Sequence, residues 1–365
     1  MADSQYHESI YSFNLFCLVL LLFYSTGCQF TSLTAEEPVL EKIEKTFSVN
    51  TGGSLTIVSE FGAIDIQTAE QNKVQVIVTK ESKSKLVKAS QEMLKDFELA
   101  FEHEGSDVRI EGAFKRGREH WRKQLNRLKI HFLVTVPRQY NIDLDTSSGG
   151  ISVADLDGDV RAKTSGGNLR LGDITGTVWG RTSGGSIELT SSGGQAELKT
   201  SGGSIEVVNV AGDVQARTSG GNLRFGAVQG SISGKTSGGN IKVAKCNGGA
   251  DVQTSGGNII LQNVGGSVNA KTSGGNIHAF MIKQPDSDCR LHTSGGGITT
   301  ILIPDIAVDV EAETSGGHVS TDFAVESVIQ GKVPKNRLKG SINGGGPLLK
   351  LRTSGGSIHL QKATD

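Results

Sequence analysis

Six cationic side chains recur at one place in a sequence repeat and are candidates for binding a repeating anion. Neighbours in this set lie eighteen residues apart, apart from one double step across Gln253. The members, here called the cation column, are Lys163, Arg181, Lys199, Arg217, Lys235 and Lys271. Lys and Arg bind carboxylate and phosphate groups through charge-assisted hydrogen bonds. The column is therefore a candidate contact for an acidic glycan or another anionic envelope polymer.

A structural explanation of the same column stays open. Long Lys and Arg stems shield apolar strand surface and discourage edge pairing. Like charges stacked about 4.8 Å apart repel one another, however, so a purely structural column would gain by mixing signs. Mixing occurs elsewhere in the repeat, at Arg170, Glu188, Glu206 and Arg224. The formal net charge of -1 gives the chain no overall attraction to nucleic acid, which we do not expect as a partner.

Cys28 is the second residue with candidate chemistry, because its surroundings resemble a lipoprotein signal. Leu15 to Tyr24 is an apolar run typical of a signal-peptide core and too short to span a membrane. Ser25-Thr26-Gly27-Cys28 resembles the bacterial lipobox, whose cysteine receives lipid. We expect a signal peptide over 1–27, a tether over 28–45, and an exported protein held at the cell envelope by its lipid. Cleavage near this point without lipidation is the alternative.

Catalytic and metal-binding patterns are absent from the sequence. The eight His are scattered, and none has metal-ligand spacing with Cys or Asp. The turns lack the GGxGxD pattern of calcium-binding rolls, and the acidic run Asp155 to Asp159 has its glycine misplaced for an EF-hand. We therefore predict no enzyme, cofactor or metal, although a polysaccharide-active enzyme stays as a remote alternative. Cys246 and Cys289 are expected to be buried and unpaired.

The elements that must position the cation column follow from the repeat itself. A threonine returns every eighteen residues from Thr146 to Thr272, and then at wider steps to Thr293, Thr314 and Thr353; it begins TSSG at Thr146 and TSGG at the others. If each Thr is position 1, positions 6 and 8 are apolar in every unit of the eighteen-residue series, as at Ile205 and Val207, and the cation column is position 18. A fixed short period of this kind is typical of stacked repeats.

Two strands and two turns account for each unit. Positions 15 and 17 form a second inward pair, and glycine recurs nine residues after the TSGG turn. Strands of this length bury one face only when stacked on neighbours. The prediction is an all-β protein, a single parallel β-solenoid with two strands per coil, over 146–362. Positions 6, 8, 11, 15 and 17 lie inside, and the crossover rule favours a right-handed wind. Asn at position 5, as in Asn240 and Asn258, is expected to hydrogen-bond from coil to coil.

The region 46–145 is predicted to form the first coil of the solenoid, followed by a segment that is not part of the stacked coils. Leu55 and Ile57 fit positions 6 and 8 of a first coil, and Ile64 and Ile66 fit positions 15 and 17. Helical spacing predicts one short helix near 84–97. The basic segment, defined here as residues 115–129, carries seven Lys or Arg around Trp121 and is a possible extension of the cation column. A second excursion, 322–340, precedes the last TSGG coil.

Several of these motifs together resemble the bacterial "putative adhesin" domains of unknown function, which are exported β-solenoids. The resemblance is carried by GGSLTI at Gly52 to Ile57, the strand Val134 to Pro137, the TSGG series and the terminal NGGGP followed by TSGG. It covers about 46–362 and implies surface adhesion, without a known substrate or catalytic residue. An adhesin-like binding module is thus the expected function, and a passive envelope scaffold is the alternative.

Overall fold

The structure, a computed structural model, describes residues 39–82, 87–326 and 334–364. The described residues belong to one compact unit. The expected signal peptide and Cys28 lie outside the described residues. Among those that are described, no helix has the length and apolar character needed to cross a membrane.

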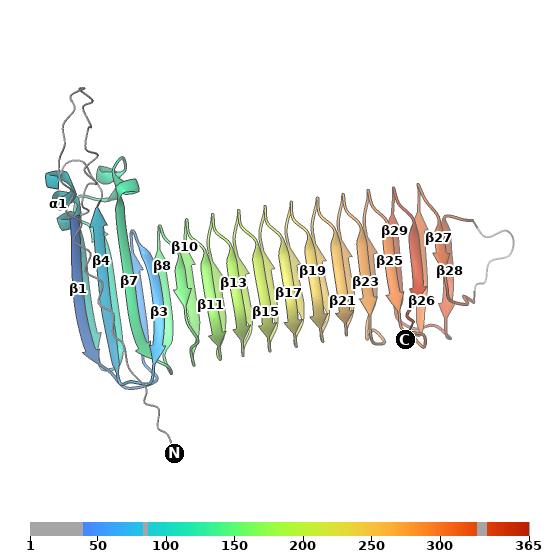
Figure 1. Ribbon diagram of the computed structural model, residues 1–365. Helices are drawn as coiled ribbons and strands as arrows, with labels where there is room; N and C mark the ends of the chain where they lie inside the picture. The colour runs from blue at the N-terminus through green and yellow to red at the C-terminus, as the bar shows by residue number, and fades with distance from the viewer. Residues whose placement is uncertain (1–38, 83–86, 327–333, 365) are drawn as a thin grey trace, which may run out of the picture. The chain divides into compact units, whose positions relative to one another are not determined.

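Two long β-sheets make up almost all of the unit (Figure 1). Sheet A contains, in spatial order, β1 (Val39–Ser48), β4 (Lys73–Ser82), β7 (Leu128–Pro137), β3 (Ala63–Ala69), β9 (Ile151–Val153), β11 (Leu169–Ile174), β13 (Ile187–Ser192), β15 (Ile205–Val210), β17 (Leu223–Val228), β19 (Ile241–Cys246), β21 (Ile259–Val264), β23 (Ile277–Met281), β25 (Ile298–Leu302), β30 (Ile358–Lys362) and β27 (Val319–Thr321). Sheet B contains β28 (Arg337–Ile342), β26 (Val308–Thr314), β29 (Leu348–Thr353), β24 (Cys289–His292), β22 (Val268–Lys271), β20 (Ala250–Gln253), β18 (Ile232–Lys235), β16 (Val214–Arg217), β14 (Ala196–Lys199), β12 (Val178–Arg181), β10 (Val160–Thr164), β8 (Asn141–Thr146), β2 (Ser54–Ser59), β6 (Asp107–Phe114) and β5 (Phe97–Glu104).

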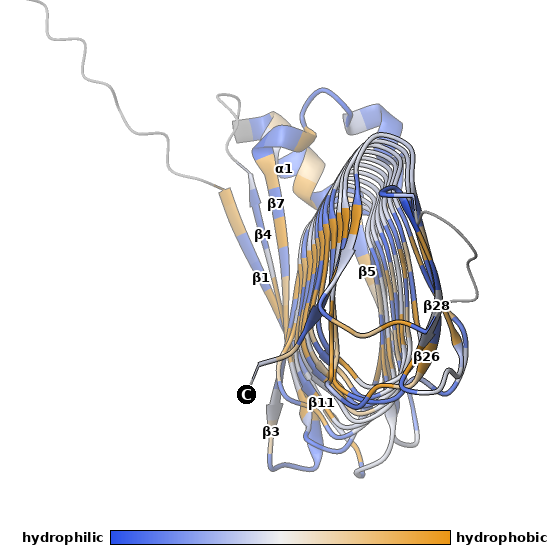
Figure 2. Cartoon of the chain, turned by 90° about the vertical axis from the view of Figure 1, so that its right-hand side faces the viewer, coloured by the Kyte–Doolittle hydropathy of each residue, from blue (hydrophilic) through white to orange (hydrophobic). Residues whose placement is uncertain are grey.

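The predicted solenoid is confirmed through the regular array, residues 146–281. Each coil gives one strand to each sheet, and the view along the stack shows the two sheets facing each other (Figure 2). Parallel pairing places Ile205, Leu223 and Ile241 in one column, and all three are buried. The side chains at positions 11, 15 and 17 also point inward, as at Val210, Val214 and Ala216. Cys246 and Cys289 are buried and free, as expected.

The threonine of each TSGG turn links its coil to the one before. Thr182 Oγ1 donates a hydrogen bond to the carbonyl of Gly167, 2.8 Å away, and accepts one from Gly185 N. The same pair of bonds recurs at Thr164, Thr200, Thr218, Thr236, Thr254 and Thr272. The threonine hydroxyl is buried, and it gives a hydrogen-bond partner to one backbone carbonyl and one backbone N–H at the corner. Without it, these two backbone groups would lose that partner.

The asparagines at position 5 also link coils, as predicted. Their partner is backbone rather than another side-chain amide: Asn240 Oδ1 accepts from Asn258 N at 2.8 Å. Position 14, nine residues on, repeats the arrangement, because Asp213 Oδ1 accepts from Ser231 N at 2.7 Å. Asp155 and Asp159 in the acidic run likewise accept backbone N–H groups of the next coil.

The second glycine of TSGG is required by close approach rather than by a left-handed backbone. A Cβ on Gly167 would lie 2.1 Å from the carbonyl oxygen of Gly149 in the preceding coil. Among the glycines of the array, only Gly149 has a positive φ, of 121°, and Asn263 is the one other described residue of the array with a positive φ, of 54°. The close approach of the preceding coil therefore excludes a side chain at the other TSGG corners.

The first coil is placed half a turn away from its predicted phase. Leu55 pairs with Ile142 in sheet B, so β2 occupies the column of positions 15 and 17 rather than 6 and 8. Ile64 aligns with Ile151 in sheet A, in the column of position 6. The two half-coils have similar glycine and apolar spacing, so the sequence pattern fits either phase.

The chain is threaded out of order at both ends of the stack. The β2–β3 coil lies between the pairs β6–β7 and β8–β9. At the other end, the last coil of the sequence, β29–β30, inserts between β24–β25 and β26–β27. The excursion after β27 lets the chain return, and β28 then pairs antiparallel with β26.

The N-terminal region adds elements that break the parallel pattern. β4 pairs antiparallel with both β1 and β7, and β5 pairs antiparallel with β6. The predicted helix is present as α1, Val87–Asp96, and it contacts β1, β4 and β5. The expected tether, 28–45, overlaps β1, so residues from Val39 onward belong to a strand. Backbone pairing with β4 holds this stretch in the sheet.

Candidate functional site

The cation column is assembled on the outer face of sheet B. Parallel pairing sets Lys163 beside Arg181, then Lys199, Arg217 and Lys235 on successive strands, with Gln253 before Lys271. All but Lys163 are exposed. The register thus brings together residues that are eighteen positions apart in the sequence.

Pairing divides the column into a neutralised end and an unpaired centre. Lys163 Nζ lies 2.6 Å from Asp145 Oδ2 on the neighbouring strand. In the part of the chain that the structure describes, no carboxylate forms an ion pair with the four cations from Arg181 to Lys235. The centre of the column therefore keeps its positive charge for an external anion.

The column continues past Lys271 to residues that the sequence period missed. His292 aligns with Lys271, and Arg352 aligns with His292. Burial, followed by the nearby charges of Lys271 and Arg352, lowers the pKa of His292 below its usual value. The imidazole is therefore neutral near pH 7. The sequence could have predicted that both residues belong to the column, because each of them directly precedes the threonine of a TSGG motif.

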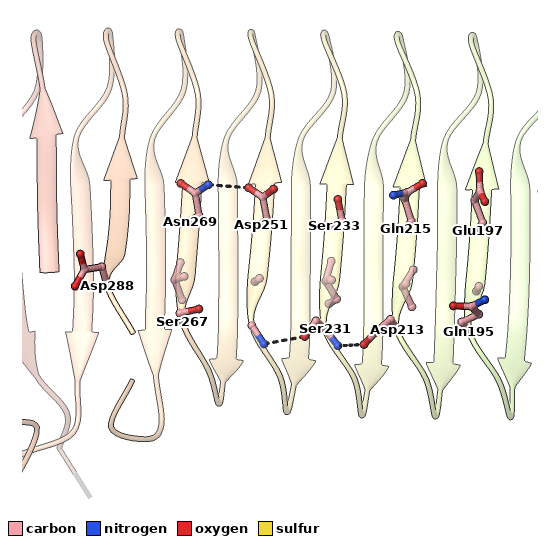
Figure 3. Close-up of a pocket in the computed structure, with 16 residues that line it drawn as sticks. Gln195, Glu197, Asp213, Gln215, Ser231, Ser233, Asp251, Ser267, Asn269 and Asp288 are labelled. Carbon is pink, nitrogen blue, oxygen red and sulfur yellow. Dashed lines mark hydrogen bonds between the residues drawn. The ribbon is translucent and has the colours of Figure 1, made fainter. Parts of the chain in front are cut away.

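A groove runs along the same face beside the column. It has a volume of about 560 Å³ and is lined by positions 14 to 16 of successive coils. Figure 3 shows its polar side chains, which are Gln195, Glu197, Asp213, Gln215, Ser231, Ser233, Asp251, Ser267, Asn269 and Asp288. Sequence reasoning did not single these out, although polar residues at positions 14 and 16 alternate with the buried position 15 in most coils.

Part of the groove's hydrogen-bonding capacity is unused. Asn269 Nδ2 donates to Asp251 Oδ1 at 2.9 Å, and Asp213 accepts from the next coil. Among the described residues, the side chains of Glu197, Gln215 and Ser233 have no hydrogen-bond partner. Carboxylate, amide and hydroxyl groups together offer both donors and acceptors, as polyhydroxylated ligands require.

An aromatic ring lies next to one end of the groove. Trp179 is half-buried and pairs with Glu197 on the neighbouring strand. The guanidinium of Arg161 stacks 3.9 Å from the centre of its ring, and Arg161 in turn lies 3.6 Å from Asp143. These contacts hold the indole at the surface instead of burying it in the core.

The outer face of sheet A differs in its charge arrangement. Arg170 lies 3.5 Å from Glu188, and Arg224 lies 3.7 Å from Glu206, on neighbouring strands. Charges of both signs are therefore mixed on this face of the array, although Glu188 pairs with Glu206, whereas the cation column of sheet B carries like charges in a row.

The basic segment does not extend the column with an exposed aromatic ring. Trp121 is buried, and its Nε1 donates to Asp96 Oδ2 at 2.5 Å. Arg116 Nε also bonds Asp96, at 2.8 Å. Burial by itself would raise the pKa of Asp96, but the hydrogen bonds from Trp121 and Arg116 outweigh it and lower that pKa. The ring is therefore a structural group. That the basic segment extends the cation column stays a prediction.

Groups with possible catalytic chemistry are sparse. Ser320 Oγ lies 2.7 Å from His359 Nδ1, and both side chains are on the surface. Across the described residues, no three His, Cys, Asp or Glu side chains are grouped closely enough to hold a metal ion.

Comparison with known proteins identifies a family and several similar solved structures. The family model described as Toastrack DUF4097 matches residues 54–247. Similar solved structures include a putative cell adhesion protein from Clostridium sporogenes, with 14% identity, coverage of 88% of this chain and 100% of that one, and a TM-score of 0.20. A putative adhesin from Bacteroides fragilis has 12% identity, 88% and 97% coverage and a TM-score of 0.28. A putative lipid binding protein from Parabacteroides distasonis has 13% identity, 90% and 98% coverage and a TM-score of 0.31. No curated protein matches the sequence.

Proposed function

The chain belongs to the Toastrack DUF4097 family, and for this member we propose a binding module, exported and lipid-anchored, that recognises an acidic glycan of the cell envelope or its surroundings. The binding face is the outer face of sheet B. The cation column contacts the acidic groups, and the neighbouring groove contacts the sugar hydroxyls.

The observation that carries this proposal is the unpaired centre of the cation column beside a polar groove. Four unneutralised cations on consecutive strands repel one another. The fold does not require four like charges there, because a column of mixed sign fits the same coils on sheet A. Cations held at a fixed spacing by paired strands lose little freedom when they bind a repeating anion. Repeated weak contacts then add to a useful affinity.

The groove narrows the ligand class from polyanions in general to acidic glycans. Its carboxylates, Glu197, Asp213, Asp251 and Asp288, repel a polymer that carries charge on every face. A glycan presents acidic groups at intervals and hydroxyl groups between them. It can therefore place the former over the cations and the latter over the groove. Trp179 offers a partly exposed ring against which a sugar can pack.

Charge reversal tests the proposal. The triple variant Arg181→Glu, Lys199→Glu and Arg217→Glu should lose binding on an array of uronic-acid, sulfated and neutral glycans. Because all three side chains are exposed, each change should cost only about 0.5 kcal/mol of folding free energy. A matched control reverses Arg224, Lys242 and Lys245 on sheet A, which changes net charge equally on the opposite face.

Two further measurements vary the salt concentration and the type of ligand. Wild-type binding should weaken between ~50 and ~500 mM salt. Equal loss in the sheet A control, or salt-insensitive binding that survives in the sheet B variant, contradicts the proposal and favours a passive scaffold. Binding of polyphosphate as tightly as acidic glycans contradicts the role given to the groove. Release of new reducing ends from a bound glycan would instead reveal an enzyme.

The anchor is a separate part of the proposal. Cys28 in its lipobox-like context would carry the lipid, and export would follow from the segment before it. Replacing Cys28 with Ser should move the protein out of the lipid-modified fraction, measured by the mass of the N-terminal peptide. If the N-terminal peptide of the wild-type protein has the mass expected for a peptide without lipid, the proposed anchor is refuted.

A further inference from the structure

The basic segment lies at the same end of the N-terminal region as the start of β1. Val39, the first described residue, pairs with Ser82 of β4, and Ser82 pairs with Leu128 at the start of β7. The basic segment leads directly into Leu128. Figure 1 shows α1 and the short turns of this segment grouped at this end of β1, β4 and β7.

Backbone and side-chain hydrogen bonds fix the segment in this place. Lys115 N donates to the carbonyl of Asp96, the last residue of α1, at 2.9 Å. Two short 3-10 helices follow, Arg118–Trp121 and Leu125–Arg127, and the first is tied down by the buried bond from Trp121 to Asp96. The segment is therefore attached to α1 instead of projecting freely.

The part of the basic segment that does not contact α1 exposes cationic side chains to solvent. Arg122, Lys123 and Arg127 are exposed, and neither Lys123 nor Arg127 forms an ion pair within the described residues. Arg122 has one acidic neighbour, Glu119, 3.8 Å away, and both of these side chains are more than three-quarters exposed. Exposed pairs of this kind contribute little and do not neutralise the surface. The segment contains seven Lys or Arg and one Glu.

The chain outside the described residues limits how far this cationic side can lie from a membrane. Ten residues separate Cys28 from Val39, and a fully extended chain of that length reaches at most about 35 Å. A lipid on Cys28 therefore keeps the start of β1, and the basic segment two strands away, close to the lipid surface. Clusters of Lys and Arg held near a membrane are attracted by its anionic headgroups.

We propose that the exposed cations of the basic segment, Arg122, Lys123 and Arg127, contact anionic phospholipid headgroups of the membrane that holds the N-terminus. This inference rests on the membrane attachment in the proposed function but not on glycan binding. The contact gives the anchored protein a second attachment point. It would also leave the cation column of sheet B free for its own ligand.

Hydrogen exchange on the full-length protein reconstituted in vesicles tests the contact. Backbone amides of residues 118–127 should exchange about fivefold more slowly in vesicles of equal parts phosphatidylcholine and phosphatidylglycerol than in phosphatidylcholine alone. The difference should disappear in the variant Arg122→Glu, Lys123→Glu and Arg127→Glu, and it should shrink at ~500 mM salt. The sheet B triple variant serves as the matched control and should keep the full difference.

Each other outcome has a defined meaning. Equal exchange in both kinds of vesicle, or protection that survives the basic-segment variant, overturns the inference. Equal protection of these amides by inorganic phosphate without anionic lipid also overturns it, because a small-anion site would then explain the result. If the N-terminal peptide lacks lipid while protection persists, the proposed lipid on Cys28 fails and the headgroup contact stands.

Discussion

The regular array and the N-terminal region use the same two sheets but are stabilised in different ways. In the array, coils repeat similar bonds, in which a Thr side chain and an Asn or Ser side chain satisfy backbone groups of a neighbouring coil. In the N-terminal region, one buried cluster joins Asp96, Arg116 and Trp121 from elements that are far apart in sequence. No other part of the described chain repeats that cluster.

This difference predicts how strongly each region responds to the loss of one hydrogen bond. A lost bond in the array removes one of many equivalent links, and the coils on either side keep theirs. A lost bond in the cluster leaves several buried partners without replacement. Folding of the array depends on nearest-neighbour stacking, as in other repeat proteins, whereas the N-terminal region depends on long-range pairing.

The largest effect is expected for glycine at an array corner. Gly167→Ala should cost about 3 kcal/mol of folding free energy, because the new Cβ would lie 2.1 Å from the backbone oxygen of Gly149. Gly166→Ala, in the same turn, has no atom within 4 Å and should cost less than about 1 kcal/mol. In the N-terminal region, Gly117 has open space but a φ of 76°, so Gly117→Ala should cost about 1 kcal/mol. Urea unfolding of the three variants measures this order, and equal costs at Gly166 and Gly167 would break the comparison.

The next effect concerns the buried cluster. Asp96→Ala should cost about 2 kcal/mol, since Trp121 Nε1 loses its acceptor inside the protein and Arg116 loses its ion pair. Hydrogen exchange should localise the loss to α1, β5 and the basic segment, with the array unchanged. A loss spread evenly through β11 to β23 would mean that the two regions unfold as one unit.

A smaller effect separates two buried threonines. Thr218→Val should cost about 1–2 kcal/mol, because it removes a donor to Gly203 and an acceptor for Gly221 N. Thr300 is also buried, but within the described chain its hydroxyl has no partner. Thr300→Val, which keeps the shape, should therefore be neutral or stabilising by up to about 1 kcal/mol. Thermal unfolding of both variants checks the contrast, and destabilisation by Thr300→Val would show that its hydroxyl is satisfied.

The smallest effect is a pH dependence that differs between the N-terminal region and β24, which stacks directly after the array. The pKa of His292 is lowered in the folded state, so the unfolded chain binds a proton first as the pH falls below about 6.5. The free energy of unfolding should then decrease in mildly acid solution and be level above that pH. Asp96 also has a lowered pKa, and its contribution is lost only near and below pH 3.8. Urea midpoints measured from pH 5 to 8 test this prediction, and the decrease in mildly acid solution should disappear in the variant His292→Gln. If the decrease keeps its size in that variant, another titrating group causes it.

The array could be predicted closely because its interactions are periodic. Buried columns, the coil boundaries and the order of the cation column follow from eighteen-residue spacing, and pairing confirms them at each coil from Lys163 to Lys271. The same regularity explains the error in the first coil. Leu55 and Ile64 fit either half-coil, and only the pairing of Leu55 with Ile142 resolves the phase.

The groove was missed for a related reason. Its residues at positions 14 and 16 differ in chemical type from coil to coil, so no single column stands out in the sequence. Their common feature is the face they share, and that appears when β14 to β22 are stacked.

The sequence by itself determined the repeating coil, its inward positions and the residues that carry charge outward, because strand alternation and glycine corners are local properties. Only the tertiary structure decided which coils are neighbours at the two ends, why Trp121 is buried, and which cations keep an acidic partner. Those outcomes depend on contacts between segments separated by long excursions, such as β29 entering between β24 and β26, and Arg116 with Trp121 meeting Asp96. Such contacts are selected by the packing of the whole chain, and no local pattern specifies them.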